Sequence, residues 1–228
     1  MLDAALRTIG EALFPARCIG CRRRGTPLCS ACRAELPYLP RGLCPRCATP
    51  RLGTTCRGCR RLSPSVSAIH AAFVYERAAR AAVVSLKFKS ARYLADLMGE
   101  LLVECLAVQP VQADLVVPVP LSKARLRQRG YNQAALLARP VASVVHGTLA
   151  TSVLTRTDRR SQRTLSATQR LSNLAGAFRC PHDQAVVGQR VLLVDDVITT
   201  GATVSTCADT LARAGASRVS VLAFARDL

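Results

Sequence analysis

The amino-acid sequence predicts an α/β protein in which a parallel sheet, covered by helices, follows a small zinc-binding module. Three observations support this fold class. Four Cys-x-x-Cys pairs fall within residues 18–59, strand and helix patterns alternate after residue 66, and residues 191–203 read as a strand, a hydroxyl-rich loop and a helix start. We therefore expect residues 1–66 to form an N-terminal helix and a double zinc ribbon, and residues 67–228 to form the sheet domain.

Composition excludes several classes of protein. Half of the 228 residues are hydrophobic and 20% are charged, which excludes a disordered chain. The longest stretch without a charged side chain, residues 140–155, is too short and too polar to span a bilayer, and the first residues lack the pattern of a signal peptide. We expect a soluble, cytoplasmic protein with no membrane span. Its net charge is +18, carried almost wholly by arginine.

Eight of the eleven cysteines form four Cys-x-x-Cys pairs, namely Cys18/Cys21, Cys29/Cys32, Cys44/Cys47 and Cys56/Cys59. Two such pairs complete a tetrahedral all-cysteine site, so we expect two structural Zn²⁺ ions. Sequential pairing closes the shortest loops and is favoured by chain entropy, although a cross-braced arrangement would use the same eight ligands. No strand–helix pattern surrounds a single pair, which argues against a thioredoxin-like redox motif. We expect Cys105, Cys180 and Cys207 to be buried or spare thiols.

Hydrophobic periodicity predicts the remaining elements in chain order. Leu2, Leu6, Ile9 and Leu13 share one face of a short amphipathic helix. Further along, we expect helices near 92–107, 131–145 and 203–214 and strands at 115–119, 190–194 and 219–224. The strands are almost continuously apolar, which is typical of a parallel sheet buried on both faces. Gly215 is placed to end the last helix in a left-handed conformation.

The most informative stretch is Val-Leu-Leu-Val-Asp-Asp-Val-Ile-Thr-Thr-Gly-Ala-Thr, residues 191–203. Ligands of parallel sheets bind beyond the carboxyl ends of strands, where Asp195 and Asp196 are expected. These acids suit sugar hydroxyls or a divalent cation carried by a ligand. Small and hydroxyl side chains at a helix N-terminus suit a phosphate, and Gly201 allows a positive φ or a close backbone approach. The phosphate-binding residues would be Thr199, Thr200, Gly201, Ala202 and Thr203.

A second strand end carries positive charge. Four basic residues follow the 115–119 strand within seven positions and would create a field suited to diphosphate: Lys123, Arg125, Arg127 and Arg129. A solvated basic loop and a nucleic-acid contact remain alternatives. The chain has no Gly-x-x-x-x-Gly-Lys loop and no Gly-x-Gly-x-x-Gly after a strand, so neither an ordinary P-loop nucleotidase nor a dinucleotide-binding fingerprint is supported.

Two further segments have open interpretations. Residues 156–173 are polar and hold five arginines, so they form either a mobile flap that closes over a ligand or a linker. The tripeptide Lys87-Phe88-Lys89 is either a solvated helix end or a contact to the site.

The 191–203 string resembles the diphosphosugar-binding signature of type I phosphoribosyltransferases. The resemblance implies that Asp195 and Asp196 contact the ribose hydroxyls of 5-phosphoribosyl-1-diphosphate (PRPP) and that residues 199–203 cradle its 5-phosphate. The basic segment then resembles the diphosphate loop. Together with the 191–203 string, the zinc pairs and three further motifs make the chain, from about residue 14 to 224, similar to the ComF family (ComFC or GntX-like). Members of this family consist of a double zinc ribbon followed by a phosphoribosyltransferase-like domain. The three motifs are Pro118-Val119-Pro120, Arg129-Gly130-Tyr131-Asn132-Gln133 and Gln162…Leu165-Ser166.

This resemblance has functional implications. Phosphoribosyltransferases displace diphosphate from the ribose C1 with a nitrogen nucleophile; Mg²⁺, Lys123 and nearby arginines would stabilise the leaving group, and Asp195 or Asp196 could act as general base. A ComF protein is expected to handle incoming single-stranded DNA during natural transformation, alone or with DNA-processing proteins, through its basic zinc module. Two functions stay open: a PRPP-dependent transferase, or a non-catalytic PRPP sensor that binds nucleic acid. One departure, Ser161 where a proline is expected, concerns only the stiffness of the flap.

Overall fold

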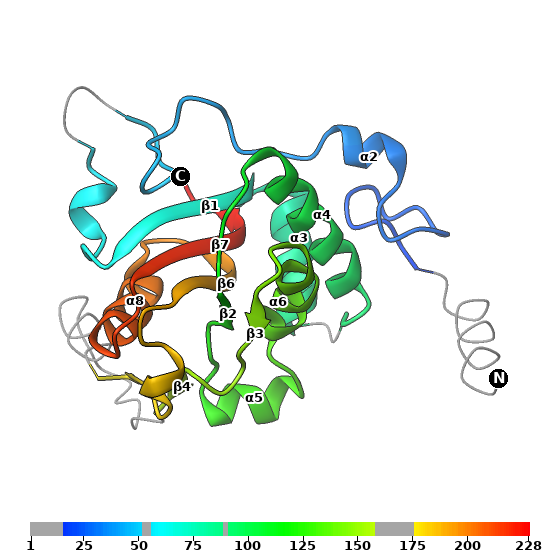
Figure 1. Cartoon of the computed structure of the whole chain (residues 1–228). Helices are drawn as coiled ribbons and strands as arrows, with labels where there is room; N and C mark the ends of the chain where they lie inside the picture. Colours follow the sequence, from blue (N-terminus) through cyan, green and yellow to red (C-terminus); the bar gives the residue numbers. More distant parts are fainter. Residues whose placement is uncertain (1–15, 52–55, 89–90, 158–175) are drawn as a thin grey trace, which may run out of the picture.

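The computed structural model describes residues 16–51, 56–88, 91–157 and 176–228 (Figure 1). The predicted N-terminal helix and the predicted flap from residue 158 to 173 therefore lie outside the described residues. The elements in chain order are α2 (Ser30–Ala34), η1 (Cys59–Arg61), β1 (Val66–Val74), α3 (Arg77–Phe88), α4 (Leu94–Val108), β2 (Leu115–Pro118), α5 (Lys123–Arg129), α6 (Gln133–Val144), β3 (Thr148–Leu149), β4 (Thr155–Arg156), β5 (Phe178–Arg179), η2 (Asp183–Ala185), β6 (Arg190–Ile198), α8 (Ala202–Arg213) and β7 (Arg218–Arg226).

The predicted parallel sheet is confirmed. Five strands pair in the order β1-β7-β6-β2-β3, and all four pairings between neighbours are parallel, while β4 and β5 form a separate antiparallel pair. The chain leaves β2 through α5 and α6 to β3 on one side, and leaves β6 through α8 to β7 on the other. The strand order therefore reverses between β2 and β6. Such a reversal opens a crevice at the carboxyl ends of the two strands, where ligands of α/β sheets bind.

The three predicted helices after residue 91 correspond to α4, α6 and α8, and the three predicted strands correspond to β2, β6 and β7. Gly215 follows α8 with a φ of 97°, as its predicted capping role requires. Two predictions need correction. The strand at 190–194 continues to Ile198, because β7 pairs with it as far as Arg226. The basic segment is helix α5 and not a loop, because Ser122 caps its N-terminus and Gly130, with a φ of 76°, ends it.

Helices cover both faces of the sheet, and the side chains divide into two cores. One core joins α3, α4 and α6 to side chains such as Leu192 and Val194 of β6. The other joins α8 to Val191 and Leu193 of the same strand. Alternate residues of a strand point to opposite faces, so β6 supplies both cores. Figure 1 shows the sheet between α8 and the group α3, α4 and α6. No helix in the described part of the chain is long and apolar enough to cross a membrane.

The two cysteine-rich segments pack on opposite faces of the sheet. Ile19 and Leu36 join the α3–α4–α6 core, and Arg33 forms an ion pair with Glu104 of α4. Cys44, Cys47 and Leu62 instead join the α8 core. The chain that connects the two segments follows the outer edge of the sheet, where the Val74 amide donates to the Pro37 carbonyl (2.7 Å) and the Leu39 amide to the Ala72 carbonyl (3.0 Å).

Candidate functional site

The eight paired cysteines form two clusters, each built from neighbouring pairs. In each cluster the four Sγ atoms lie within 4.8 Å of one another. The first cluster consists of Cys18, Cys21, Cys29 and Cys32, and the second of Cys44, Cys47, Cys56 and Cys59. Sγ–Sγ distances between ligands of one cluster include 3.3 Å for Cys47 and Cys56 and 3.7 Å for Cys18 and Cys29. A tetrahedral site with Zn–S bonds of about 2.3 Å separates its sulfurs by about 3.8 Å. Both clusters therefore fit structural Zn²⁺, and the sequential pairing is confirmed.

The other three cysteines belong to neither cluster. Burial raises the pKa of the Cys105 thiol to about 11 and raises the pKa of Cys180 and Cys207 as well. A thiol with a raised pKa holds little of the reactive thiolate at neutral pH. These residues are thus spare thiols, as the sequence predicted.

The carboxyl ends of β2 and β6 carry the segments that the sequence marked as a site. After β2, the Val119 carbonyl accepts a hydrogen bond from Asn132 Nδ2 (3.1 Å), and Asn132 Oδ1 caps α6 by accepting from the Ala134 amide (3.0 Å). Asn132 thereby fixes where α5 ends and α6 begins relative to the strand. After β6 comes the 199–203 segment, which opens α8. The reversal in strand order thus brings the basic segment and the acidic strand end to one crevice.

Asp195 and Asp196 point to opposite faces of the sheet, because they are consecutive residues of β6. Asp196 faces α3, where Lys87 Nζ lies 2.8 Å from its Oδ1. Asp195 lies on the α8 side, beside the 199–203 segment, and accepts a hydrogen bond on Oδ1 from the Asp196 amide (2.9 Å). The two acids therefore have different partners.

Asp196 is the most constrained polar group of the site. Its side chain is only 2% exposed, yet its Oδ2 atom has no hydrogen-bond partner among the described residues. A buried carboxylate oxygen without a donor costs free energy, so a ligand that supplies a hydroxyl or a cation here would be favoured. The sequence left Lys87 open between a solvated helix end and a site contact; the ion pair shows that it contacts Asp196. Lys89 lies outside the described residues.

Arg129, the last residue of α5, reaches toward the same place. Its guanidinium lies 5.3 Å from the ring centroid of the exposed Phe88 and donates to Gln133 Oε1 (2.9 Å). Burial lowers the pKa of Arg129, and the Asp196 and Asp195 carboxylates oppose this effect by attracting its charge. The Tyr131 hydroxyl donates to the Leu86 carbonyl, which fastens the end of α3 to the start of α6.

The other basic residues of α5 stand farther out. Lys123, Arg125 and Arg127 are exposed, whereas Arg129 is half-buried. Residues four apart share a face of a helix, so Arg125 lies on the same face as Arg129, while Lys123 and Arg127 lie on another. Of the four basic residues predicted for the site, the structure brings Arg129 into electrostatic reach of both acids.

The 199–203 segment surrounds a small hollow. Residues 195 and 197–204 line a space of about 40 Å³, which exceeds the roughly 10–15 Å³ needed by one water molecule and is far below the roughly 300 Å³ of an ordinary ligand pocket. The hollow therefore suits a small group such as a phosphate. Gly201 has a φ of 83°, and a Cβ at this position would come 2.5 Å from Leu62 Cδ2. Both observations explain why glycine occupies this position.

Asp195 is the residue whose titration departs furthest from ordinary behaviour in the site. Burial, followed by the neighbouring Asp196 carboxylate, raises its pKa to about 8. A strongly perturbed acid in a cleft is a common feature of functional sites. Asp195 therefore holds its proton over a pH range in which most aspartates are ionised.

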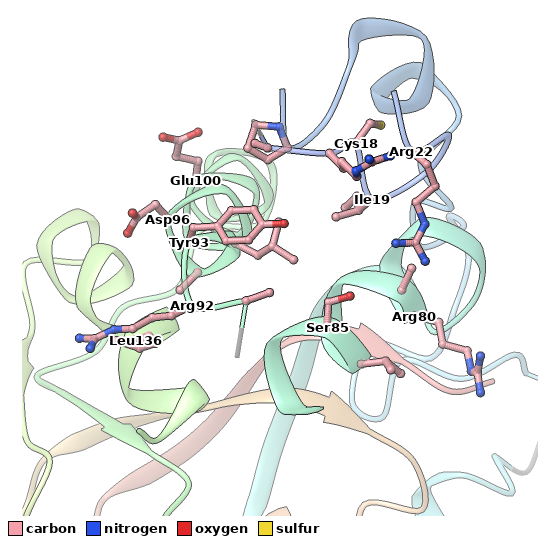
Figure 2. A pocket seen from close by; sticks show the side chains of 18 of the residues that line it. Cys18, Ile19, Arg22, Arg80, Ser85, Arg92, Tyr93, Asp96, Glu100 and Leu136 are labelled. Atoms are coloured by element: carbon pink, nitrogen blue, oxygen red, sulfur yellow. The ribbon is translucent and has the colours of Figure 1, made fainter. Parts of the chain in front are cut away.

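A separate and much larger groove lies between the first cysteine cluster and the α3–α4–α6 face. It has a volume of about 1850 Å³ and is lined by six arginines, Arg17, Arg22, Arg77, Arg80, Arg92 and Arg139, against the two acids Asp96 and Glu100. Figure 2 shows Tyr93 reaching into this space, with Arg22 beside Cys18 on the cysteine-rich segment, Arg80 on α3, and the two acids on the other side of Tyr93 from these arginines. The Tyr93 side chain is exposed. The groove is thus basic and offers one aromatic face.

Two of the groove arginines have unusual backbone conformations. Arg22 and Arg77 have φ values of 65° and 44°, in the left-handed region that β-carbons disfavour. Arg22 directly follows the second cysteine of the Cys18/Cys21 pair. Ala48 has the equivalent position after the Cys44/Cys47 pair, with a φ of 53°. Backbone strain of this kind gathers at functional sites.

Comparisons with known proteins agree with this architecture. Residues 9–63 match a model described as a double zinc ribbon domain, and residues 131–227 match a phosphoribosyl transferase domain. The chain is 32% identical over 209 residues to "DNA utilization protein YhgH" of Escherichia coli (strain K12), covering 88% of this chain and 91% of that protein.

Two further relatives are named for competence. "Competence protein F" of Haemophilus influenzae is 29% identical, covering 93% of this chain and 98% of the relative, and "Competence protein ComFC" of Bacillus subtilis is 28% identical, covering 82% and 79%. A solved structure of "the allosteric regulatory enzyme of purine biosynthesis" aligns at a TM-score of 0.41 and 21% identity over 58% of this chain and 25% of that one. The two domain matches in this order and the relatives of nearly full length together show that the chain belongs to the ComF family, in which a double zinc ribbon precedes a phosphoribosyltransferase domain.

Proposed function

We propose that the crevice between β2 and β6 binds PRPP together with Mg²⁺. The observation that carries this proposal is the buried Asp196 carboxylate, which has one oxygen on Lys87 and the other without a donor among the described residues. A ribose hydroxyl would supply that donor. The hollow of residues 195 and 197–204 would take the 5-phosphate, and the basic residues of α5, with Arg129 nearest the acids, would take the diphosphate.

Mg²⁺ prefers oxygen ligands and keeps several of its waters, so it is usually held by substrate phosphates and one or two carboxylates. Asp195 and Asp196 offer carboxylate oxygens, but they point to opposite faces of the sheet. This donor set fits an ion that arrives with the diphosphate and touches one of the two acids. When bound, Mg²⁺ would neutralise charge that develops on the diphosphate.

Calorimetric titration of the zinc-loaded protein with PRPP and Mg²⁺ tests this proposal. We expect saturable binding of one PRPP per chain. The Asp195→Asn/Asp196→Asn double variant should weaken PRPP binding by about thirtyfold or more, because a hydrogen bond to the ion-paired Asp196 contributes roughly 1.5–3 kcal/mol and one to the protonated Asp195 roughly 0.5–1.5 kcal/mol. Its zinc content should remain two ions per chain.

The matched control is Asp114→Asn, which changes a carboxylate at the opposite end of β6, where Asp114 pairs with Arg190. This variant should bind PRPP as the unmodified protein does. Retained affinity in the double variant, or equal loss in the control, would contradict the assignment of the acids.

A second measurement separates the two candidate activities of the site. Release of diphosphate from PRPP in the presence of nitrogen nucleophiles indicates a transferase. Binding without release under any acceptor in the screen indicates a sensor.

We further propose that the protein handles DNA, through the basic groove of Figure 2. Its volume of about 1850 Å³ exceeds that of an ordinary small-molecule pocket and suits a segment of a polymer. Six arginines and one exposed tyrosine match the combination of backbone charge and base stacking that binds single strands. The names of the relatives, for DNA utilization and competence, agree with this role.

Binding of a fluorescent oligonucleotide at several salt concentrations tests the DNA proposal. Each phosphate contact to single-stranded DNA contributes about 0.7 to the slope of log affinity against log salt concentration. We expect the Arg22→Gln/Arg80→Gln variant to weaken binding and to reduce that slope by about 1.4. Arg213→Gln/Arg218→Gln, which also removes two positive charges, at the exposed end of α8 and the exposed start of β7, should leave the slope unchanged. Equal slopes for both variants would exclude the groove.

A further inference from the structure

A buried arginine connects the second cysteine cluster to the 199–203 segment. Arg226, the last residue of β7, is only 4% exposed. Its Nη1 donates to the carbonyl oxygens of Ile198 (2.9 Å) and Thr199, and its Nε donates to the carbonyl oxygen of Cys47 (3.4 Å). Cys47 is a ligand of the second cluster. One guanidinium therefore touches a metal-binding turn and the start of the hollow at the same time.

Other contacts link the same two regions. Leu62, which directly follows η1 of the second cluster, packs against Gly201 so closely that a Cβ there would come 2.5 Å from Leu62 Cδ2. The Ser63 amide donates to Ser205 Oγ (3.1 Å), and the Ser63 hydroxyl donates to the Asp209 carboxylate, both on α8. The second cluster thus forms one wall against which the loop and the start of α8 rest.

The first cluster has contacts of another kind. Among the described residues, Ile19 and Leu36 join the α3–α4–α6 core and Arg33 pairs with Glu104, on the opposite face of the sheet. Loss of metal from the first cluster should therefore not disturb residues 199–203. The two clusters, alike in ligands, differ in what they support.

We propose that the metal in the second cluster sets the affinity of the 199–203 segment for a phosphate, with Arg226 as the positioning residue between them. Without metal, the Cys47 turn loses the constraint that fixes its carbonyl, since ligand geometry in such knuckles depends on the ion. Arg226 then loses one of its three acceptors, and a buried guanidinium with a missing acceptor is driven to rearrange. The loop that Arg226 holds through Ile198 and Thr199 loosens, and preorganisation for the phosphate is lost.

This inference rests on the phosphate-binding role proposed above for residues 199–203, and the first test separates the two. Hydrogen exchange of the 198–204 peptide is measured without PRPP in Cys44→Ser and in the matched variant Cys18→Ser, which change the first ligand of each cluster. Each variant should lose one of two zinc ions. We expect faster exchange of this peptide in Cys44→Ser only; equal exchange in the two variants overturns the inference, whatever PRPP does.

PRPP affinity is the second readout. We expect Cys44→Ser to weaken PRPP binding by roughly 5- to 150-fold, the usual range of coupling between sites, and Cys18→Ser to change it less than about twofold. If the unmodified protein fails to bind PRPP, the proposed function is wrong and the exchange experiment alone decides the inference. If PRPP binds and both variants retain full affinity, the proposed function stands and the inference is wrong.

Arg226 variants keep the inference testable if Cys44→Ser does not fold. Arg226→Met preserves both clusters and removes all three hydrogen bonds, so it should weaken PRPP binding as Cys44→Ser does. Arg226→Lys retains a buried cation for the Ile198 and Thr199 carbonyls but lacks the fork that also reaches Cys47. It should restore affinity, and in its background Cys44→Ser should have a smaller effect, because only the Leu62 and Ser63 contacts then link the cluster to the loop.

Arg190→Met is the control for these variants, because it breaks an ion pair with Asp114 at the opposite end of β6. It should leave PRPP affinity unchanged. If Arg226 only stabilised the fold, Cys44→Ser would reduce PRPP affinity by the same factor in the Arg226 variants as in the otherwise unmodified protein. That result, or full affinity in Arg226→Met, overturns the positioning role.

Discussion

Asp195 and Asp196 are neighbours in the chain but have different electrostatic surroundings. Lys87 Nζ lies 2.8 Å from Oδ1 of Asp196, whose side chain is 2% exposed. Burial, together with the Asp196 charge, raises the pKa of Asp195 to about 8 despite the attraction of Lys87. Asp195 can therefore hold a proton at neutral pH, whereas Asp196 offers as a hydrogen-bond acceptor its Oδ2 atom, which has no partner among the described residues.

The raised pKa of Asp195 predicts a particular dependence of stability on pH. Between about pH 4 and pH 8, the folded protein holds this proton more tightly than the unfolded chain does, so ionisation over that range lowers the free energy of unfolding. Asp195→Asn removes the ionisation. We expect its stability relative to the unmodified protein to be higher at pH 9 than at pH 6, as measured by urea unfolding.

Asp114→Asn provides the contrast. The Arg190 guanidinium lowers the pKa of Asp114 to about 2, so this acid is ionised in the folded and unfolded states at both pH 6 and pH 9. Its substitution should change stability by the same amount at the two pH values. An equally constant difference for Asp195→Asn would contradict the raised pKa.

Some residues of the site could be predicted from the sequence and others could not. Asp195, Asp196 and Gly201 were identified because a strand, two acids and a small-residue loop follow one another directly. Lys87 and Arg226 are remote from that string, by 109 and 30 residues from Asp196, and only the pairing of strands brings them near it. Lys87 offered one weak signal, as one of only three lysines among 32 basic residues.

Helices and strands, like single residues, were predictable where local sequence determines them and not where pairing with distant segments does. Helices α4, α6 and α8 were predicted because their apolar periodicity and caps are local properties of the chain. The acids of β6 were expected beyond the strand, because two adjacent carboxylates suit a loop better than a buried strand. Pairing with β7 through Arg226 overrides this preference and extends β6 to Ile198. The edge strand β1 and helix α3 were not predicted.

The cysteine-rich elements depend on metal more than the sheet does. Helix α2 has five residues, none of them buried, so regular structure and apolar burial contribute little there. Structural zinc contributes about 10–16 kcal/mol in small zinc-binding peptides. We expect a strong chelator to remove two zinc ions per chain and to expose eight thiols to a thiol reagent, and zinc to reverse the change. Unchanged circular dichroism and thiol accessibility after complete zinc removal would contradict this.

At the scale of the whole molecule, the order of the strands determines where the chemistry lies. The sequence predicted a parallel sheet but not the order β1-β7-β6-β2-β3, because two of its four pairings, β1 with β7 and β2 with β6, join strands that are distant in the chain. The crevice between β2 and β6 follows from that order alone. The position of the two cysteine clusters on opposite faces was likewise beyond local reasoning, since it depends on how the connecting chain crosses the sheet edge.

That connecting chain has a consequence for the behaviour of the protein in solution. An outer strand such as β1 presents unpaired amide and carbonyl groups, which can recruit a strand from another molecule and begin aggregation. The hydrogen bonds from Val74 to Pro37 and from Leu39 to Ala72 occupy part of this row. The segment at 37–39 lies between the two cysteine clusters, so metal bound in both clusters would hold this segment against β1 and thereby oppose self-association of the sheet. Conditions that strip the ions would therefore be expected to cost the protein its solubility as well as its local order.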